Sequence, residues 1–304
     1  MGKIYIGISG WRYPPWRGIF YPKGLRQADE LAFASRALPS IELNGSFYAL
    51  QKPESYSTWF EATPPDFIFS TKGNRYITHI QRLRDIDVPL ANVFASGVLN
   101  LREKLGPFLW QFPPSFRYDA ERVEHFLSLL PHDTEQALEL ARHCDPGRRE
   151  RSVPVIDKKR KLRHAMEIRH DSFIDPSFIA LLRKYDVALV VADSAGKWPD
   201  REDVTADFVY LRLHGEAALY SGGYTEEALD YWAERIGAWS RGLQPEGKLI
   251  SDAKPRKRIS RDIYCYFDND IKVDAPFDAR RLIDKLGLKL HLTPFGGMGQ
   301  PATT

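Results

Sequence analysis

The segment FVYLRLHG, residues 208–215, is the stretch that decides the fold. In a β-strand, its aliphatic residues at 209, 211 and 213 point to one face, and the other face carries Tyr210, Arg212 and His214. An aliphatic face is suited to packing against helices, whereas a charged face needs partners that satisfy it. We therefore predict a strand of a closed barrel, with its polar face turned into the interior.

Seven other short apolar runs recur along the chain, and most of them also end in a charged or amide side chain; they span residues 4–9, 40–44, 68–72, 108–112, 165–169, 187–193 and 263–268. Segments with apolar residues at three- and four-residue spacing lie between them, at 119–130, 178–185, 225–239 and 277–286. Alternation of strand and helix indicates a parallel sheet. The pattern predicts an α/β fold, a single-domain (β/α)8 TIM-like barrel over residues 1–289. A basic insertion is expected around 133–163, and a flexible C-terminal tail at 290–304.

The polar residues near the strand ends locate the candidate site. Reactive groups of such barrels gather where the strands exit toward one face. Strand parity turns Glu42 with Asn44, and Glu167 with Arg169, into the barrel, as it does Lys72. One interpretation is a buried ion-pair network that only fills the interior. The other is a functional site, which we favour because barrel interiors are normally filled by branched aliphatic residues.

The residue types suggest acid-base chemistry on an anion. Two carboxylates on opposite walls, Glu42 and Glu167, could act as acid and base if their environments separate their pKa values, and His214 joins them as a candidate catalytic residue. Further residues near the strand ends or in the loops are expected to bind substrate: Trp11, Tyr13, Asn44, Tyr48, Lys72, His79, Gln111, Arg169, Asp193 and Arg212. For the aromatic members, the alternative is simple packing of loops.

Composition narrows the class of protein. Of the 304 residues, 43% are hydrophobic and 27% charged, and the formal net charge is +3, which allows an anionic ligand but is low for a dedicated nucleic-acid-binding domain. The two cysteines, Cys144 and Cys265, do not have the spacing of a zinc site. We expect a soluble cytoplasmic protein because neither a signal peptide nor a membrane-spanning apolar stretch occurs.

The sequence supports no particular cofactor. It lacks a Walker loop, a Rossmann glycine triplet, a GxSxG elbow and an HExxH motif, so nucleotide cofactors have no sequence support. A metal site could be assembled in a barrel from His79, His214, Glu42, Glu167 and Asp193, but no local spacing such as HxxxH supports one.

Several motifs together resemble the YecE-like family, a barrel family of unknown function. They are SGWRY at 9–13, ELN at 42–44 with FY at 47–48, ITH at 77–79, QFPPSF at 111–116, EIRH at 167–170 and YLRLHG at 210–215. The resemblance covers about residues 4–286 and implies a TIM-like barrel without an established reaction. Where similar sequences tend to have Phe-Asn-Asn, this chain has Phe267, Asp268 and Asn269. Of these, Asn269 is the residue that the resemblance adds to the substrate-binding set.

Three hypotheses of function follow. The first is an enzyme acting on a small anionic polar substrate, sugar-phosphate-like or nucleotide-like, with glycoside hydrolysis as a narrower variant. The second is nucleic-acid binding or processing through the basic stretches Arg148–Arg163 and Lys254–Arg258, whose alternative is solvated loops. The third is a non-catalytic ligand-binding barrel.

Overall fold

The strands form a closed parallel barrel in the order β1 to β8, as the sequence predicts. We describe a computed structural model, which covers residues 1–149, 154–216, 222–269 and 273–289. The strands are β1 (Ile4–Ser9), β2 (Ser40–Leu43), β3 (Ile68–Lys72), β4 (Leu105–Gln111), β5 (His164–Glu167), β6 (Ala188–Asp193), β7 (Phe208–Leu213) and β8 (Asp262–Phe267). The ring closes where β1 pairs with β8, with Tyr5 opposite Tyr264.

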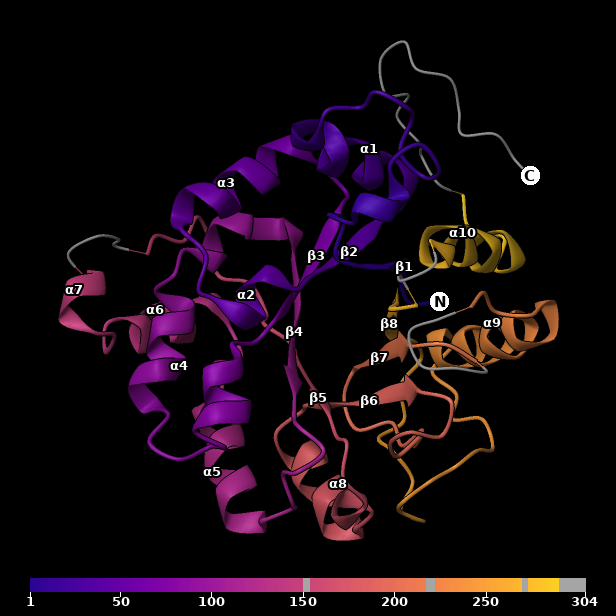
Figure 1. The fold of residues 1–304 in the computed structure, drawn as a ribbon. Coiled ribbons are helices and arrows are strands. Elements are labelled where there is room, and N and C mark those ends of the chain that lie inside the picture. The colour runs from indigo at the N-terminus through magenta and orange to yellow at the C-terminus, as the bar shows by residue number, and fades with distance from the viewer. Residues whose placement is uncertain (150–153, 217–221, 270–272, 290–304) are drawn as a thin grey trace.

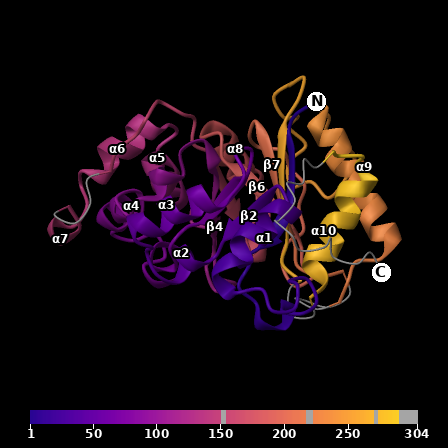
Figure 2. The same ribbon diagram turned by 90° about the horizontal axis from the view of Figure 1, so that it is seen from above.

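Helices surround the strands in the view of Figure 1. Their bounds are α1 (Glu30–Ala37), α2 (Gly45–Tyr48), α3 (Pro53–Ala62), α4 (Asp87–Phe94), α5 (Ala120–Leu129), α6 (Thr134–Ala141), α7 (Pro146–Arg149), α8 (Pro176–Lys184), α9 (Glu226–Ser240) and α10 (Asp274–Lys285). Short 3-10 turns lie at Pro14–Trp16, Gln27–Asp29, Val98–Lys104 and Asp171–Phe173, and Tyr76–Ile80 forms a π-helix. Figure 2 shows the same shell of helices from above.

The expected alternation of strand and helix fails between β6 and β7. The described connection from residue 194 to 207 contains no helix. It folds instead through turns in which the Ser194 hydroxyl accepts a hydrogen bond from the Trp198 amide, and it brings the Trp198 ring against the core inside the barrel. In this connection, an aromatic side chain in a turn packs against the barrel, and no helix does so.

Strand parity divides the apolar residues into two cores, as expected. Aliphatic residues of the outward face, such as Leu211 and Leu213, belong to the large cluster that packs on the helices. The barrel interior holds a smaller cluster of Leu109, Ala165, Ala188, Val190, Ala192, Ala206, Phe208, Tyr210, Tyr264 and Tyr266. Aromatic rings and alanines thus fill much of the barrel, in place of branched aliphatics, and leave its carboxyl end to charged groups.

The basic insertion expected around 133–163 contains α6 and α7 in its described part, and an antiparallel bridge joins Asp133 to Lys161. The predicted tail at 290–304 lies outside the described residues. Within the described part of the chain, no helix has both the length and the apolar character needed to cross a bilayer.

Candidate functional site at the carboxyl end of the barrel

The guanidinium of Arg212 is the centre of the polar cluster. Arg212 projects inward from β7 and is 1% exposed. Its Nη1 lies 2.8 Å from Glu167 Oε2, and its Nη2 lies 2.9 Å from both Glu42 Oε1 and Asp268 Oδ2. Nε makes a further hydrogen bond of 3.0 Å to Glu42 Oε2. One cation is therefore held by three carboxylates that come from β2, β5 and the end of β8.

Other inward side chains fix Glu42 in place. The Tyr210 hydroxyl donates to Glu42 Oε2 at 2.6 Å, and the Ser9 hydroxyl donates to Oε1 at 3.0 Å. Asn44 in turn donates to the Ser9 hydroxyl at 2.7 Å, whereas its own Oδ1 is buried without a hydrogen-bond partner among the described residues. Both oxygens of Glu42 are therefore occupied, and Asn44 retains an unused acceptor.

Glu167 is similarly saturated. Gln111 Nε2 donates to both of its oxygens at 3.1 Å, and Arg169 Nε donates to Oε1 at 2.7 Å. Burial alone would raise the pKa of Glu167, but the charges of Arg169 and Arg212 outweigh it and hold this pKa well below the usual value. Glu167 is therefore a carboxylate at neutral pH.

His214 and Asp268 complete the cluster on the β7–β8 side. His214 is fully buried; its Nδ1 lies 2.9 Å from Asp268 Oδ2 and its Nε2 lies 3.8 Å from Glu167 Oε1. Burial opposes ionisation of Asp268, but the charges of Arg212 and His214 lower its pKa overall. Asp268 is thus part of the Arg212 network.

Lys72 differs from the other cations in the cluster. It ends β3, it is 9% exposed, and its Nζ lies 4.4 Å from the centroid of the Phe47 ring. Among the described residues, no carboxylate lies within salt-bridge distance of that Nζ. Burial, reinforced by the charge of Arg212, lowers the pKa of Lys72 to about 8. Within the described part of the chain, the ammonium group therefore has no direct counter-ion while it is largely removed from water.

His79 also contacts the ring of Phe47. The π-helix Tyr76–Ile80 carries it, its Nδ1 lies 2.8 Å from the Thr78 hydroxyl, and its ring meets Phe47 edge-on at 5.0 Å. Burial and the charges of Lys72 and Arg169 lower the pKa of His79 to about 4. At neutral pH this imidazole is uncharged, and π-helical turns of this kind frequently occur at functional sites.

These contacts join the six residues that were expected to share one pocket. Arg212 contacts Glu42, Glu167 and His214, and Arg169 contacts Glu167. Lys72 interacts electrostatically with the same carboxylates. Gln111 and Asn44 also reach this cluster through Glu167 and Ser9. The guanidinium of Arg169 lies 4.2 Å from the centroid of the Trp198 ring. The side chains of the barrel end therefore form one connected set.

Other residues predicted to bind substrate have different surroundings. Trp11 is buried and meets Trp59 edge-on at 5.5 Å, and the Tyr13 hydroxyl donates to the Ser9 carbonyl at 2.6 Å. These contacts favour loop packing, the alternative expectation for the aromatic residues. Tyr48, by contrast, is 69% exposed beside Phe47.

Asp193 and Asn269 also stand apart from the Arg212 contacts. Asp193 accepts a hydrogen bond of 3.0 Å from the Tyr224 hydroxyl, and burial raises its pKa. The amide of Asn269 donates to the Gly222 carbonyl at 2.9 Å and to Asp278 of α10 at 2.8 Å. Both residues connect strand ends to neighbouring segments, and both hydrogen bonds of Asn269 are donated by its Nδ2.

Sequence reasoning omitted several members of the cluster from the predicted site. Strand parity places Ser9, Tyr210 and Asp268 inside the barrel, so their positions were available from the alternation of each strand. Phe47 and Trp198 had no comparable signal, because both lie in connections whose course depends on tertiary packing. For the metal hypothesis, the described residues contain no group of three His, Cys, Asp or Glu side chains arranged to hold a metal ion.

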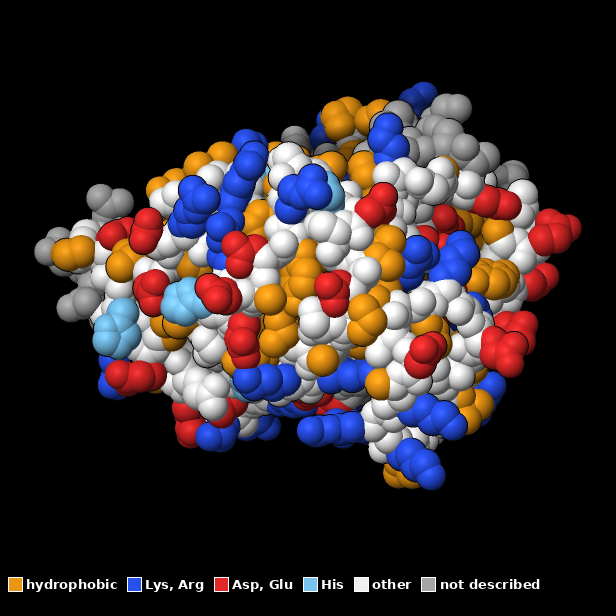
Figure 3. Space-filling view, turned by 90° about the horizontal axis from the view of Figure 1, so that it is seen from below, with side chains coloured by type: hydrophobic (Ala, Val, Ile, Leu, Met, Phe, Trp, Pro, Cys, Tyr) orange, Lys and Arg blue, Asp and Glu red, His pale blue; other side chains and the backbone are white. Residues whose placement is uncertain are grey.

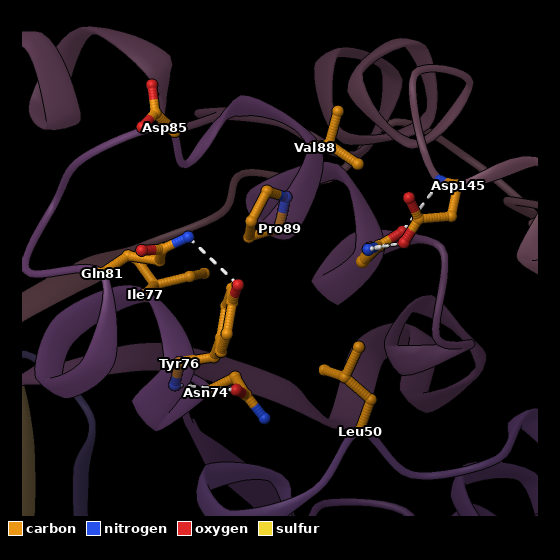
Figure 4. A pocket seen from close by; sticks show the side chains of 10 residues that line it. Leu50, Asn74, Tyr76, Ile77, Gln81, Asp85, Val88, Pro89 and Asp145 are labelled. Carbon is orange, nitrogen blue, oxygen red and sulfur yellow. Dashed lines mark hydrogen bonds between the residues drawn. The ribbon is translucent and has the colours of Figure 1, made fainter.

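A hollow of about 470 Å³ lies beside the π-helix (Figure 4). Apolar side chains, including those of Leu50 and Val88, line part of it. Its charged lining residues are acidic, Asp85 and Asp145, and the carboxylate of Asp145 accepts a hydrogen bond from Asn92. Because no described cation lines this hollow, its described lining is poorly suited to an anion.

Comparisons with known proteins agree with the resemblance noted in the sequence. The family described as "Protein of unknown function DUF72" matches residues 5–301. UPF0759 protein YecE of Escherichia coli O157:H7 is 33% identical over 244 residues, which are 80% of this chain and 84% of YecE. UPF0759 protein YunF of Bacillus subtilis strain 168 is 32% identical over 127 residues, which are 40% of this chain and 44% of YunF.

Solved structures of two bacterial DUF72 family proteins share the fold. The protein from Thermotoga maritima superposes with a TM-score of 0.69 at 24% identity, covering 94% of this chain and 99% of its own. The protein from Enterococcus faecalis superposes with a TM-score of 0.68 at 18% identity, covering 96% of this chain and 98% of its own. The YecE-like resemblance and the barrel fold are thereby confirmed.

Proposed function

The chain belongs to the DUF72 family of uncharacterised barrel proteins, and from that premise we propose that it is an enzyme that binds a small polar anion at Lys72 and moves a proton there. One observation carries the proposal: the buried ammonium of Lys72 has no carboxylate within salt-bridge distance among the described residues. Leaving a cation desolvated and without a counter-ion is unfavourable. An anionic group of a ligand would supply the missing partner.

The surrounding groups suit a phosphate- or carboxylate-bearing metabolite. Arg169 adds a second positive charge at the same end of the barrel. Its guanidinium lies 4.2 Å from the centroid of the half-buried Trp198 ring, which is the aromatic surface nearby. The unused Oδ1 of Asn44 can accept a hydrogen bond from a ligand hydroxyl. These features support a sugar-phosphate-like or nucleotide-like compound, which combines an anion with hydroxyl groups and an apolar face.

Lys72 and His79, rather than the glutamates bound to Arg212, are the groups to which we assign proton transfer. A pKa of about 8 leaves Lys72 protonated at pH 7 but close to titration, and a pKa of about 4 leaves His79 neutral and able to accept a proton. We assign the acid role to Lys72 and the base role to His79. Both groups contact Phe47, so a ligand beside that ring can reach each of them.

Glu42, Glu167 and His214, the catalytic residues expected from the sequence, fit a positioning role in this scheme. Both glutamates bind one guanidinium and accept further hydrogen bonds, and the pKa of Glu167 is held low. Glycoside hydrolysis requires one carboxylic acid of raised pKa, whereas the charges of Arg169 and Arg212 hold the pKa of Glu167 low. The three residues instead hold Arg212, whose charge acts on Lys72.

The test is a metabolite panel screened by thermal shift at pH 7, followed by turnover assays on the compounds that bind. We expect anionic compounds to stabilise the wild type, and Lys72→Met to weaken their binding at least tenfold. Lys52→Met, which removes an exposed lysine, is the matched control and should bind as the wild type does.

Two results would contradict the proposal. Equal affinity of anionic compounds for the Lys72→Met variant and the wild type would exclude Lys72 as the anion site. Binding without turnover would leave a non-catalytic ligand-binding barrel in place of an enzyme. If turnover occurs, His79→Phe should lower kcat by about 100-fold or more, which is the usual contribution of a general base.

A further inference from the structure

A second hollow, of about 520 Å³, lies on the other side of the segment that carries His79. Its walls are the residues that follow the π-helix and the loop that leads from β4 into α5. Four arginines line it: Arg82 and Arg84 from the first wall, and Arg117 and Arg122 from the second. This volume is within the range of small-molecule binding pockets. We call it the arginine pocket.

The arginine pocket has a large excess of positive charge. Its acidic lining residue, Asp119, lies 3.0 Å from Arg122 and is paired with it. Arg82 donates to the hydroxyl of Ser115 at 3.2 Å, which orients it without neutralising it. Arg84 and Arg117 are exposed, and among the described residues neither has a carboxylate within salt-bridge distance. The adjoining hollow of Figure 4 is acidic, so the two hollows are suited to ligands of opposite charge.

Figure 3 views the molecule from the side of α5 and α8, and Lys and Arg side chains stand together at the upper left of that view. A cluster of guanidinium groups is the usual means of binding a phosphate, because each group presents parallel N–H donors that match phosphate oxygens. The half-buried ring of Tyr118 also lines the pocket and offers a face for the remainder of a ligand.

Backbone conformation adds to the case. Arg82, Leu83 and Asp85 have positive φ values of 49°, 63° and 49°, and none of them is a glycine. Such conformations persist only where the surrounding structure enforces them, and they gather at ligand sites. Here they shape the wall that presents Arg82 and Arg84.

We propose that the arginine pocket binds the phosphate group of a small phosphorylated compound, at a site separate from Lys72. A small ligand is favoured over a nucleic acid because the hollow has a limited volume, and because most of the described cations of the basic insertion already have partners. Lys159, Arg160, Lys161 and Arg163 each lie within salt-bridge distance of a carboxylate. A continuous track of unpaired cations for a polymer is therefore lacking in the described part of that stretch.

Calorimetric titration with pyrophosphate tests the proposal. We expect the double variant Arg84→Gln and Arg117→Gln to bind pyrophosphate at least tenfold more weakly than the wild type. The matched control is Arg256→Gln with Arg258→Gln, which removes the same charge from two exposed arginines of another loop and should leave the affinity unchanged. Lys72→Met should remove any pyrophosphate binding at Lys72 and leave the arginine pocket, fitted as a separate site in the titration, with unchanged affinity. Failure of the proposed function and failure of this site therefore give different results.

A second measurement locates the bound anion. Pyrophosphate should protect Arg84 and Arg117, but not Arg256, from modification by phenylglyoxal, as read by mass spectrometry. Equal affinity of the two double variants would overturn the proposal, as would equal modification with and without pyrophosphate. Displacement of pyrophosphate by a single-stranded oligonucleotide that binds more tightly would also overturn it, in favour of a nucleic-acid site.

Discussion

The three carboxylates around Arg212 outnumber its single charge, and Lys72 and Arg169 nearby restore the balance. Such a network is rigid because Glu42 and Glu167 are each held by more than one donor. Buried ion pairs of this kind contribute little net stability compared with apolar residues of the same volume, but breaking one is strongly unfavourable. At the scale of single residues, the main effect of the network is therefore on Lys72: its charges shift the pKa of Lys72, and its hydrogen bonds fix the surrounding side chains.

Replacing Glu42 by glutamine should show the cost of an unbalanced network. The amide keeps the volume but leaves the positive charge of Arg212 less compensated, so we expect the free energy of unfolding to fall by about 3 kcal/mol. Urea denaturation at pH 7 measures it. Glu139→Gln is the control, because Glu139 is 62% exposed in its surface pair with Arg142, and it should change stability by less than about 0.5 kcal/mol. Similar losses in the two variants would argue against a buried network.

Replacing Lys72 by methionine should stabilise the protein at pH 7. The pKa of Lys72 is lowered from 10.5 to about 8, so the folded state binds its proton less tightly than the unfolded state does. At 1.36 kcal/mol for each pKa unit, the variant should gain up to roughly 3 kcal/mol at pH 7.

The stability difference between Lys72→Met and the wild type should depend on pH. Between pH 8 and 10.5 the unfolded state holds more protons at Lys72, so this residue makes wild-type stability rise with pH across that window. The advantage of Lys72→Met should therefore shrink to below about 1 kcal/mol at pH 10. Urea denaturation at both pH values gives the two differences. A variant that is less stable than the wild type at pH 7 would show that Lys72 is not strained by burial.

At the scale of elements, the alternation within each strand made the barrel and most of the cluster predictable. Arg212, Glu42 and Glu167 occupy inward positions that follow from period two alone. The connections were less predictable, because their course depends on packing between distant segments. The turns from 194 to 207 and the π-helix at Tyr76–Ile80 have no local pattern that specifies them, and they carry Trp198 and His79.

The junction between β3 and the π-helix depends on Gly73. A Cβ added there would lie 2.3 Å from the ring of Trp110, which is buried and whose Nε1 donates to His164 at 3.2 Å. Because that ring has no room to move, we expect Gly73→Ala to destabilise the protein by about 2 kcal/mol. It should also weaken anion binding, since Lys72 precedes Gly73.

Gly147→Ala is the matched control for this substitution. Among the described atoms, none lies within 4 Å of a Cβ added at Gly147, which is in α7, so alanine there should be neutral or slightly stabilising. Thermal denaturation of both variants measures the contrast. Equal melting temperatures would mean that the Trp110 ring can shift to accommodate the methyl group.

At the scale of the whole molecule, the distribution of charge bears on the nucleic-acid hypothesis. The basic insertion is largely neutralised where it is described, through pairs such as Lys159 with Glu135 at 2.7 Å and Arg163 with Asp262 at 2.8 Å. The side chains of Arg148 and Arg149, and all of Arg151, lie outside the described residues. The run Lys254–Arg258 remains as a short exposed group of cations.

We therefore expect only weak, salt-sensitive binding of nucleic acid. Each phosphate contact releases counter-ions, so a site made of a few exposed cations loses its affinity steeply as salt rises. Fluorescence anisotropy with a labelled single strand and a duplex should detect no binding tighter than about 10 μM at 150 mM salt. Neutralising Lys254, Arg256, Lys257 and Arg258 together should remove whatever binding occurs at low salt. Submicromolar affinity at 150 mM salt that survives these substitutions would revive the nucleic-acid hypothesis and direct attention to the arginine pocket and the basic insertion, which hold other groups of cations.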